Sequence, residues 1–340
     1  MKNTILIILV TLLNLCNGQN KSTVEEKIKG TENSKDPNET DNDGVIYFSF
    51  DNGLTWKNTS AGLPYKISLG LGGIAVSPNS LAIATKENGL YIFDFKKNIW
   101  VNIPTDKKII ESNLGSLIFY KDKIYAGTQF DGVFNFNMQS KDWTSSSLGL
   151  GNLSIRKFTE IDNILYVGTN GGLYSFNEKL NIWEFEYGNN SLQVNGITQF
   201  GENIFIGTNQ GAFKTLKNHK EWRQVLSGRS LHNISSDEKA IYAMVYNELL
   251  TSVNNGESWH SIQKGMPEGL YTFNVIKNGN SVFAGQWDGV YRKDSPTKDW
   301  EYSSNGLPQK FAVTNMKLYK GIIIISTSER KLKEGISIKK

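Results

Sequence analysis

A tryptophan returns at nearly regular intervals along this chain of 340 residues. Seven of the tryptophans stand 37 to 44 residues apart, namely Trp56, Trp100, Trp143, Trp183, Trp222, Trp259 and Trp300. Each follows an apolar strand, a tight glycine turn and a second strand, as in Ile124–Thr128, Gly132–Phe134 and Trp143. A period of about 40 residues with this strand-turn-strand content predicts one blade per repeat, with the blades closed into a ring.

The strand count also predicts how the ring closes. The chain begins in the middle of a repeat, and the last repeat lacks a tryptophan strand of its own. We therefore expect an all-β, seven-bladed β-propeller of four-stranded antiparallel blades over residues 44–340. Its N-terminal hairpin, Val45–Phe50 with Thr55–Asn58, should join the last blade and so remove the free sheet edges. The segment Gly335–Ile338 resembles the start of a further unit and competes for the same place.

Residues 1–16 are typical of an export signal. Lys2 supplies the positive charge, and Ile5–Leu13 is an apolar run too short to span a bilayer. The only cysteine, Cys16, follows at once, and its place resembles the lipid-attachment site of bacterial lipoproteins. Leu15 departs from that pattern, which has a small residue before the cysteine.

Cleavage after Gly18 and release of a soluble protein is the alternative. Residues 17–43 are polar and charged, and cannot bury enough apolar surface to become ordered, so they predict a disordered tether. We expect an exported protein, either a bacterial cell-envelope lipoprotein or a secreted or periplasmic one. A lipid anchor would be its only membrane contact.

The formal net charge is +4, and much of the excess lies near the C-terminus. These cations are interpreted as a solvated edge and tail rather than a nucleic-acid site; they are Lys317, Lys320, Arg330, Lys331, Lys333, Lys339 and Lys340. One cysteine allows no internal disulfide. The sequence predicts a monomer without a cofactor or metal, and without a nucleic-acid partner.

Two repeats carry a further motif. The pattern Ser-x-Asp-x-Gly-x-Thr-Trp is complete in Ser49, Asp51, Gly53, Thr55 and Trp56. It returns, with Asn for Asp and Ser for Thr, in Ser252, Asn254, Gly256, Ser258 and Trp259. An acidic residue, a glycine and a hydroxyl at this spacing predict a turn held by side-chain hydrogen bonds above a tryptophan.

This motif resembles the Asp-box, or BNR repeat, of sialidase-like propellers. Families that carry it include sialidases, sortilin-type receptors, xyloglucanases and photosystem II assembly factors, so the resemblance implies a fold more than a function. The other five repeats resemble those of two-component regulator sensors and kelch proteins. In the resembling families the box lies on the outer hairpin, which implies that Asp51 stabilises a turn and is not a catalytic acid.

No catalytic set stands out. The sialidase reaction implies a clamp of three arginines, whereas only Arg156 and Arg229 of the five arginines are expected near the channel mouth. The Arg-Ile-Pro element of sialidases is absent, and the three histidines lack metal-ligand spacing. Acids placed across the ring cannot be identified from the sequence, so a glycoside hydrolase of sialidase or xyloglucanase type stays open as the alternative function.

A binding face is easier to predict, because the inner hairpin turns and the loops entering the innermost strands meet on one face of such a ring. The turns carry Trp287, the only tryptophan outside the repeat position, together with Tyr246 and Phe130. With Tyr271, these residues could form an aromatic platform. Asp288 and Asp131 lie beside them. Such a platform suits a sugar ring or a peptide. The alternative is that these are ordinary hairpin tips.

A second set comes from aligning the repeats on their Gly-Thr strand ends. Thirteen residues before Thr128 and its equivalents stand Gly72, Gly115, Arg156, Asn195, His232, Phe273 and Thr314. These residues should ring the mouth of the channel, where they either hold a ligand or keep the channel hydrated. The sequence thus favours an exported, non-catalytic binding or assembly module that recognises a protein segment or a glycan.

Overall fold

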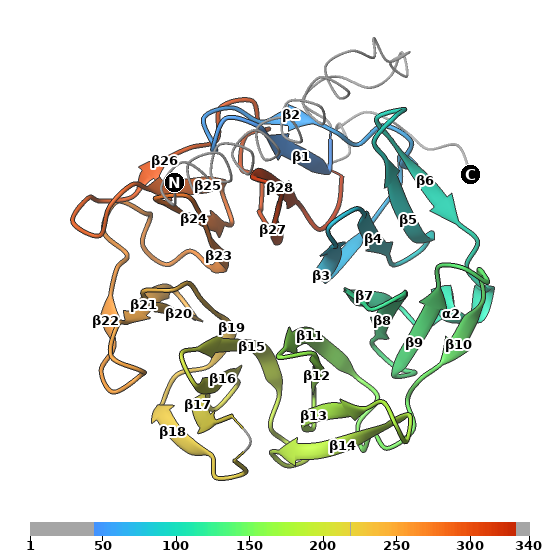
Figure 1. Ribbon diagram of the computed structural model, residues 1–340. Coiled ribbons are helices and arrows are strands. Elements are labelled where there is room, and N and C mark those ends of the chain that lie inside the picture. Colours follow the sequence, from blue (N-terminus) through green and yellow to red (C-terminus); the bar gives the residue numbers. More distant parts are fainter. Residues whose placement is uncertain (1–43, 218, 331–340) are drawn as a thin grey trace, which may run out of the picture.

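The computed structural model describes residues 44–217 and 219–330, and Figure 1 shows them as seven sheets around a central opening. Each sheet has four antiparallel strands, so the predicted seven-bladed β-propeller is confirmed. The export signal, Cys16, the tether of residues 17–43 and the segment Gly335–Ile338 lie outside the described residues and stay predictions. No helix among the described residues is long and apolar enough to cross a membrane.

Blades are numbered here in chain order, each from its innermost strand outward. Blade 1 consists of β3 (Leu69–Val76), β4 (Leu81–Thr85), β5 (Gly89–Asp94) and β6 (Ile99–Ile103). Blade 2 consists of β7 (Leu114–Tyr120), β8 (Lys123–Thr128), β9 (Val133–Asn137) and β10 (Trp143–Ser145). Blade 3 consists of β11 (Ile155–Ile161), β12 (Ile164–Thr169), β13 (Gly172–Asn177) and β14 (Ile182–Tyr187). A short helix, α2 (Lys107–Glu111), connects the first two blades.

The remaining blades repeat this order. Blade 4 consists of β15 (Val194–Phe200), β16 (Asn203–Thr208), β17 (Gly211–Leu216) and β18 (Arg223–Leu226). Blade 5 consists of β19 (Leu231–Ser236), β20 (Ile241–Val245), β21 (Glu248–Ser252) and β22 (His260–Ser261). Blade 6 consists of β23 (Thr272–Asn278), β24 (Ser281–Gln286), β25 (Val290–Lys293) and β26 (Glu301–Tyr302).

Blade 7 contains both ends of the described chain. It consists of β27 (Asn315–Tyr319), β28 (Ile322–Ser326), β1 (Ile46–Ser49) and β2 (Lys57–Asn58). Strands β1 and β28 are antiparallel, with Tyr47 opposite Ile325. The predicted closure by the N-terminal hairpin is therefore confirmed, and Figure 1 shows the blue and red ends of the chain together in one blade.

The second strand of each blade is apolar on both faces because a neighbouring blade packs on each side. Every residue of β4, β20 and β28 is buried. The apolar cores lie between blades; one of them joins Tyr120 of blade 2 to Phe158 and Trp183 of blade 3. Burial on both faces explains why these strands appear in the sequence as continuous apolar runs rather than as alternating ones.

The repeat tryptophans tie each blade to the one before it. The indole Nε1–H of Trp100 donates a hydrogen bond to the Thr59 carbonyl at 2.8 Å, and that of Trp183 donates to the Ser146 carbonyl at 2.6 Å. The equivalent bond is made by Trp56, Trp143, Trp259 and Trp300. In Trp222 the indole N–H is buried without a partner among the described residues. Six of the seven repeat tryptophans thus form a polar staple between neighbouring blades.

The strand-end threonines fix the inner hairpins. The Thr128 hydroxyl donates to the Gly132 carbonyl at 2.9 Å, across a turn in which Gly132 has φ +78°. The same bond recurs from Thr85, Thr169 and Thr208 in blades 1, 3 and 4. Blade 5 lacks the glycine, and Asn247 takes the left-handed conformation there with φ +68°. A well-held hairpin gives the residues at its tip a fixed position.

Both segments that resemble the Asp-box form hydrogen-bonded turns between outer strands, away from the channel. Asp51 accepts bonds from the Thr55 main chain at 2.9 Å and from the Ser49 hydroxyl at 2.9 Å. Burial raises the pKa of Asp51, but the hydrogen bonds from Thr55 and Ser49 outweigh it and hold the pKa below its usual value. Asn254 accepts from the Ser258 main chain at 3.0 Å in the second turn. These contacts are the ones that a turn-stabilising role requires.

Candidate functional site

A pocket of about 340 Å³ opens at one mouth of the central channel. The tips of three inner hairpins contribute Lys86, Gln129 and Asn170 to its wall. The pocket is also lined by all seven residues expected to ring this mouth, namely Gly72, Gly115, Arg156, Asn195, His232, Phe273 and Thr314. We call this site the mouth pocket.

A β-bulge near the start of the innermost strands explains this ring. In β11 the pairing passes from Ile155 directly to Lys157, so Arg156 has no partner in the ladder. The same irregularity leaves Asn195, His232 and Phe273 unpaired in β15, β19 and β23. A bulge bends its strand and redirects the extra side chain, which is how equivalent positions of successive blades come to face one opening.

Two of these bulge residues, Arg156 and Asn195, form a connected polar edge. Arg156 Nε donates to Asn195 Oδ1 at 2.9 Å, and Arg156 Nη2 donates to Gln193 Oε1 at 3.1 Å. Asn195 Nδ2 donates in turn to the Leu231 carbonyl at 2.7 Å. These bonds hold the guanidinium of Arg156 across the edges of blades 3 and 4, with a positive charge at the mouth.

His232 continues the edge on blade 5. Burial and then the charge of Arg156 lower the pKa of His232, so this imidazole is neutral at pH 7. Its Nε2 is buried without a hydrogen-bond partner among the described residues. Such an atom is available to a ligand group.

From His232 a row of rings crosses the tips of blades 5 and 6. The members of this aromatic row are His232, Tyr246, Tyr271, Phe273 and Trp287. The ring centroids of His232 and Tyr271 are 4.6 Å apart, and those of Tyr271 and Tyr246 are 4.4 Å apart, in nearly perpendicular pairs. Phe273 lies 6.1 Å from Tyr271 and 5.9 Å from Trp287. Because His232 and Phe273 also line the mouth pocket, row and pocket form one surface.

The row is open to solvent at its ends. Tyr246 is 57% exposed and Trp287 is 53% exposed. A hydrogen bond with Tyr246, followed by burial, raises the pKa of Tyr271, so Tyr271 stays uncharged at neutral pH. Sequence reasoning had placed Phe273 in the mouth ring but missed it as the link between Tyr271 and Trp287.

Other predicted site residues lie elsewhere. Phe130 is 60% exposed, but it belongs to blade 2, three blades away from blade 5, and does not join the aromatic row. Asp131 accepts a hydrogen bond at 2.5 Å from Ser112, which lies in the connection between α2 and β7. Asp288 accepts one from the Tyr291 hydroxyl at 2.9 Å. None of these three lines the mouth pocket, so the structure divides the predicted set into two groups.

The charges at the mouth pocket are of one sign. Lys86, Arg156 and Lys157 line it, whereas none of its described lining residues is Asp or Glu. Arg229, the other arginine expected here, instead pairs with Glu248 at 2.9 Å and lies outside the lining. A surface of this kind offers hydrogen bonds, apolar contact and positive charge, but it offers no carboxylate pair for acid–base work.

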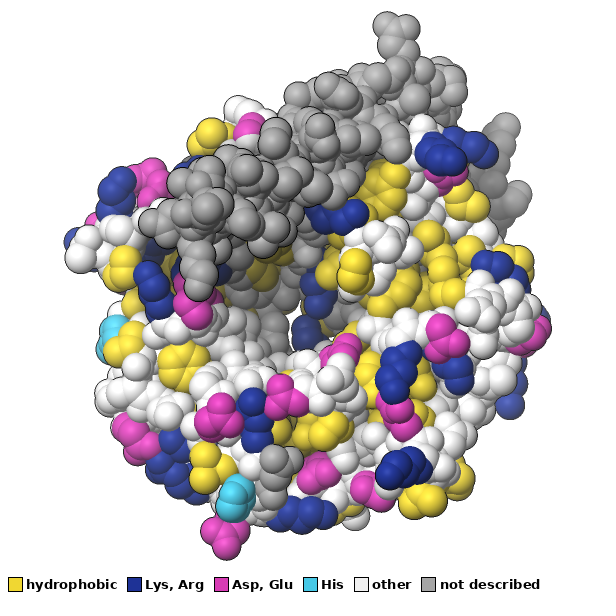
Figure 2. Space-filling view, viewed as in Figure 1, with side chains coloured by type: hydrophobic (Ala, Val, Ile, Leu, Met, Phe, Trp, Pro, Cys, Tyr) yellow, Lys and Arg dark blue, Asp and Glu magenta, His cyan; other side chains and the backbone are white. Residues whose placement is uncertain are grey.

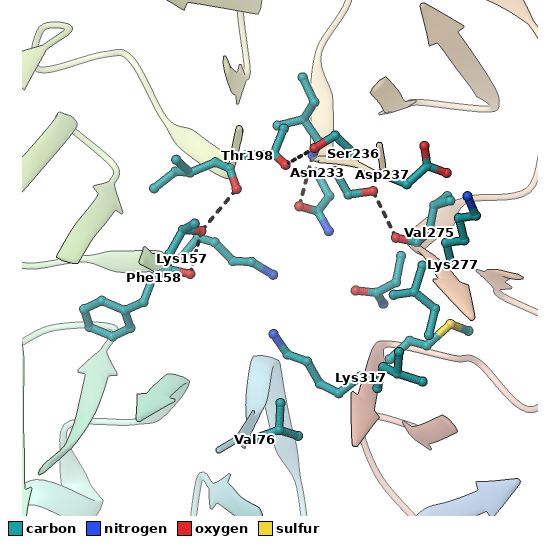
Figure 3. A pocket seen from close by; sticks show the side chains of 18 of the residues that line it. Val76, Lys157, Phe158, Thr198, Asn233, Ser236, Asp237, Val275, Lys277 and Lys317 are labelled. Carbon is teal, nitrogen blue, oxygen red and sulfur yellow. Dashed lines mark hydrogen bonds between the residues drawn. The ribbon is translucent and has the colours of Figure 1, made fainter. Parts of the chain in front are cut away.

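A second cavity, the channel cavity, occupies about 760 Å³ of the central channel. Figure 2 shows basic side chains on the wall of this central hollow. Lys157 of β11 and Lys317 of β27 both project into the cavity, and Figure 3 shows their amino groups pointing toward one another. The interpretation of Lys317 as part of a solvated edge is therefore wrong, because β27 is an innermost strand and directs this side chain into the channel.

Comparison with known proteins bears on the fold. No protein-family model matches the chain. No curated protein sequence matches it. The likeness is to solved structures at low sequence identity.

One such structure is the extracellular domain of the hybrid two component system BT4673 from B. thetaiotaomicron, with 14% identity and a TM-score of 0.65 over 80% of this chain. The chain spans only 38% of the length of that protein. Another is YCF48 bound to D1 peptide, with 12% identity and a TM-score of 0.60 over 79% of this chain and 99% of that one. The computationally designed Ika8 protein is also similar, at 12% identity and a TM-score of 0.57, over 75% of this chain and 83% of that one.

The resemblances to two-component sensor propellers and to photosystem II assembly factors are thereby confirmed at the level of the fold. Likeness to a designed propeller at similar identity shows that the shared feature is the ring of blades. Function has to be argued from the surface of this chain.

Proposed function

We propose that this chain is an exported, non-catalytic binding module that recognises a protein segment with the aromatic row and the mouth pocket. The observation that carries the proposal is the continuity of these two features. His232 and Phe273 belong to both, so an extended ligand could contact exposed rings and a polar, positively charged opening at once.

The geometry of the row favours a peptide over a flat sugar ring. Two of its contacts are edge-to-face, with interplanar angles of 84° and 89°. Perpendicular rings leave clefts that fit branched or aromatic side chains, whereas a sugar stacks best on one open ring face. The Arg156 guanidinium and the amides of Gln193 and Asn195 would contact the polar groups of an extended main chain.

Two of the similar structures support this reading by analogy. YCF48 is a propeller of matching length that was solved with a bound peptide, and BT4673 contributes an extracellular domain. Rigid propeller scaffolds that present side chains from hairpin tips suit such a role, because the residues that bind are preorganised by the blades beneath them.

Selection from a random peptide library tests the proposal. We expect sequences selected on the wild-type propeller to bind Trp287→Ala and Tyr246→Ala at least about tenfold more weakly, since exposed aromatic anchors dominate small interfaces. Phe130→Ala is the matched control, because Phe130 is an equally exposed hairpin-tip ring on the opposite part of the ring. Selected peptides that bind all four proteins equally would contradict the assignment.

The two alternatives have their own readouts. A glycan array probed with the same proteins would favour carbohydrate recognition if it gave specific signals that Trp287→Ala abolishes. Turnover of sialosides or β-glucans, lost on mutation of a channel acid such as Glu160, would establish a hydrolase instead and overturn the non-catalytic assignment.

Export and lipid attachment belong to the same proposal. Cys16 follows an apolar run with a positive start, as bacterial lipoproteins require. We expect a fatty-acid probe to label the wild-type chain and not Cys16→Ala. Equal absence of label from both, with a mature N-terminus after Gly18, would indicate the secreted form.

A further inference from the structure

The channel cavity contains two lysines without a counter-ion among the described residues. Neither Lys157 nor Lys317 forms an ion pair or donates a hydrogen bond to another residue of the described ranges 44–217 and 219–330. Their amino groups point toward one another across the cavity in Figure 3. Two ammonium groups that converge in this way raise the electrostatic potential between them.

The acids of the same cavity do not neutralise this pair. Glu238 is the ion-pair partner of Lys277. Asp237 accepts bonds from the Tyr242 hydroxyl at 2.9 Å and from the main chain of its own loop. Glu160 lines the cavity but forms no ion pair with either of the two lysines.

The polar groups of the neighbouring wall are already satisfied. The Ser236 hydroxyl donates to the Gln199 carbonyl at 2.6 Å and accepts from Thr198 at 2.7 Å. Ser235 donates to the Val275 carbonyl at 3.0 Å. The two lysines, by contrast, keep their N–H groups available to a ligand.

Burial also disfavours the protonated, charged form of both lysines. Burial and the charge of Lys317 lower the pKa of Lys157 to about 7, and burial lowers the pKa of Lys317. An anion between the two amino groups would reverse both effects, because an opposite charge favours the protonated form.

We propose that Lys157 and Lys317 bind a small tetrahedral oxyanion with two negative charges, of the sulfate or phosphate type, inside the channel. Two converging ammonium groups match two negative charges, and the cavity volume of about 760 Å³ admits such an ion with part of its water. The ion is either free or the phosphoryl group of a larger molecule that enters from the channel opening. This site lies away from the aromatic row, and Lys157 is the residue it shares with the mouth pocket. Binding of a small anion here does not require the proposed peptide recognition.

Calorimetric titration with sulfate at constant ionic strength tests the proposal. Sulfate is the better first probe because it keeps its charge near neutral pH. We expect saturable binding to the wild type, and a loss of at least about tenfold in affinity for Lys157→Gln and for Lys317→Gln. Both variants should fold, since each removes a buried charge.

Lys320→Gln is the matched control, because it makes the same change of net charge at an exposed lysine next to β27. Its affinity for sulfate should equal that of the wild type. Sulfate should also raise the pKa of Lys157, measured by NMR of the labelled amine. Comparison of inorganic phosphate with a phosphate monoester separates the two sources: tighter binding of the monoester favours an esterified ligand, and tighter binding of inorganic phosphate favours a free ion. Equal binding by wild type and both channel variants, or no saturable binding to the wild type, would overturn the site.

Discussion

Gly306 lies directly against the main-chain carbonyl of Trp56, and a Cβ on Gly306 would stand 2.3 Å from that oxygen. The neighbouring Asn305 carbonyl accepts a hydrogen bond from the Trp56 main chain at 2.9 Å. The same pairing of a left-handed glycine with the next tryptophan recurs at Gly62 with Trp100, Gly149 with Trp183 and Gly265 with Trp300. At Gly306 it has an added role, because it holds the N-terminal hairpin to blade 6.

We expect Gly306→Ala to lower the free energy of unfolding by about 3 kcal/mol, because the new methyl group meets the Trp56 carbonyl and φ is +94°. Gly321→Ala is the control: φ is +80°, but a Cβ there meets nothing within 4 Å. It should lose only about 1 kcal/mol, from backbone strain alone. Urea unfolding measures both, and equal losses would show that the close approach to Trp56 does not matter.

In the first Asp-box turn we expect Asp51→Ala to cost about 1 kcal/mol and Asp51→Asn to cost clearly less. Asn254 occupies the same place in blade 5 and makes the equivalent bonds to Ser258 and Ser252. An amide at position 51 should therefore also hold the turn by hydrogen bonds. Urea unfolding at pH 7 compares the variants. An equal loss of unfolding free energy for Asp51→Asn and Asp51→Ala would contradict the turn-stabilising role of the Asp51 side chain.

Lowering the pH should reduce the difference in stability between the wild type and Asp51→Asn. The folded-state pKa of Asp51 is lowered, so its stabilising contribution is present above pH 3.8 and is lost as the pH falls through the lower folded value. We expect the stability advantage of the wild type over Asp51→Asn to shrink in this acid range. An advantage independent of pH would mean that the ionised carboxylate is not what the turn uses.

At the mouth pocket, the positive charge of Arg156 adds to burial in lowering the pKa of His232. We expect Arg156→Gln to raise that pKa toward the ordinary value of 6.5, because only burial then remains. Histidine ring signals followed by NMR from pH 5 to 8 give the titration directly. A His232 titration that is the same in the wild type and in Arg156→Gln would contradict the effect of this charge.

In the channel, the pKa of Lys157 is lowered in the folded state from 10.5 to about 7. The unfolded chain therefore binds more protons than the folded one between these values, and this residue makes stability rise as the pH increases from 7. We expect the rise between pH 7 and 9 to be smaller in Lys157→Gln. The measurement is made without sulfate or phosphate. A slope unchanged by the substitution would show that Lys157 has an ordinary pKa.

Other ionisable groups line the two cavities around Lys157. They determine the pH range in which the contribution of Lys157 to the slope can be isolated. These are Lys86, Arg156, Glu160, His232, Asp237, Glu238, Lys277 and Lys317. The bond from Lys277 lowers the pKa of Glu238, and His232 is neutral above pH 7. Lys317 also has a lowered pKa and adds a slope of the same sign, which both proteins share.

The repeats allowed the ring and its closure to be predicted, because strand patterns and turn glycines are local features. The mouth ring followed as well, since Arg156, Asn195 and His232 occupy the same position in successive blades. The bulge that exposes them leaves no mark at a single residue, but it repeats with the period of the blades.

Contacts between blades were harder to predict. Nothing local in the sequence brings Phe273 between Tyr271 and Trp287, or separates Phe130 from them by three blades. Lys317 was misread because charge counting treats a lysine near the end of a chain as exposed, whereas the direction of its side chain depends on the register of β27. The geometry of the ring thus decides which residues of different blades come together in a site. The sequence pattern of a single repeat does not contain that information.

The pairing of β1 with β28 has a consequence for how the protein is made. Strand β1 leaves the ribosome before the other described strands, and its partner is the last of them. The edge of β1 that faces β28 must therefore stay unpaired until the last strand has been synthesised, and the ring becomes continuous only when the final blade forms. Completion of the fold is then a single late event, because the closed ring depends on the long-range pairing of β1 with β28.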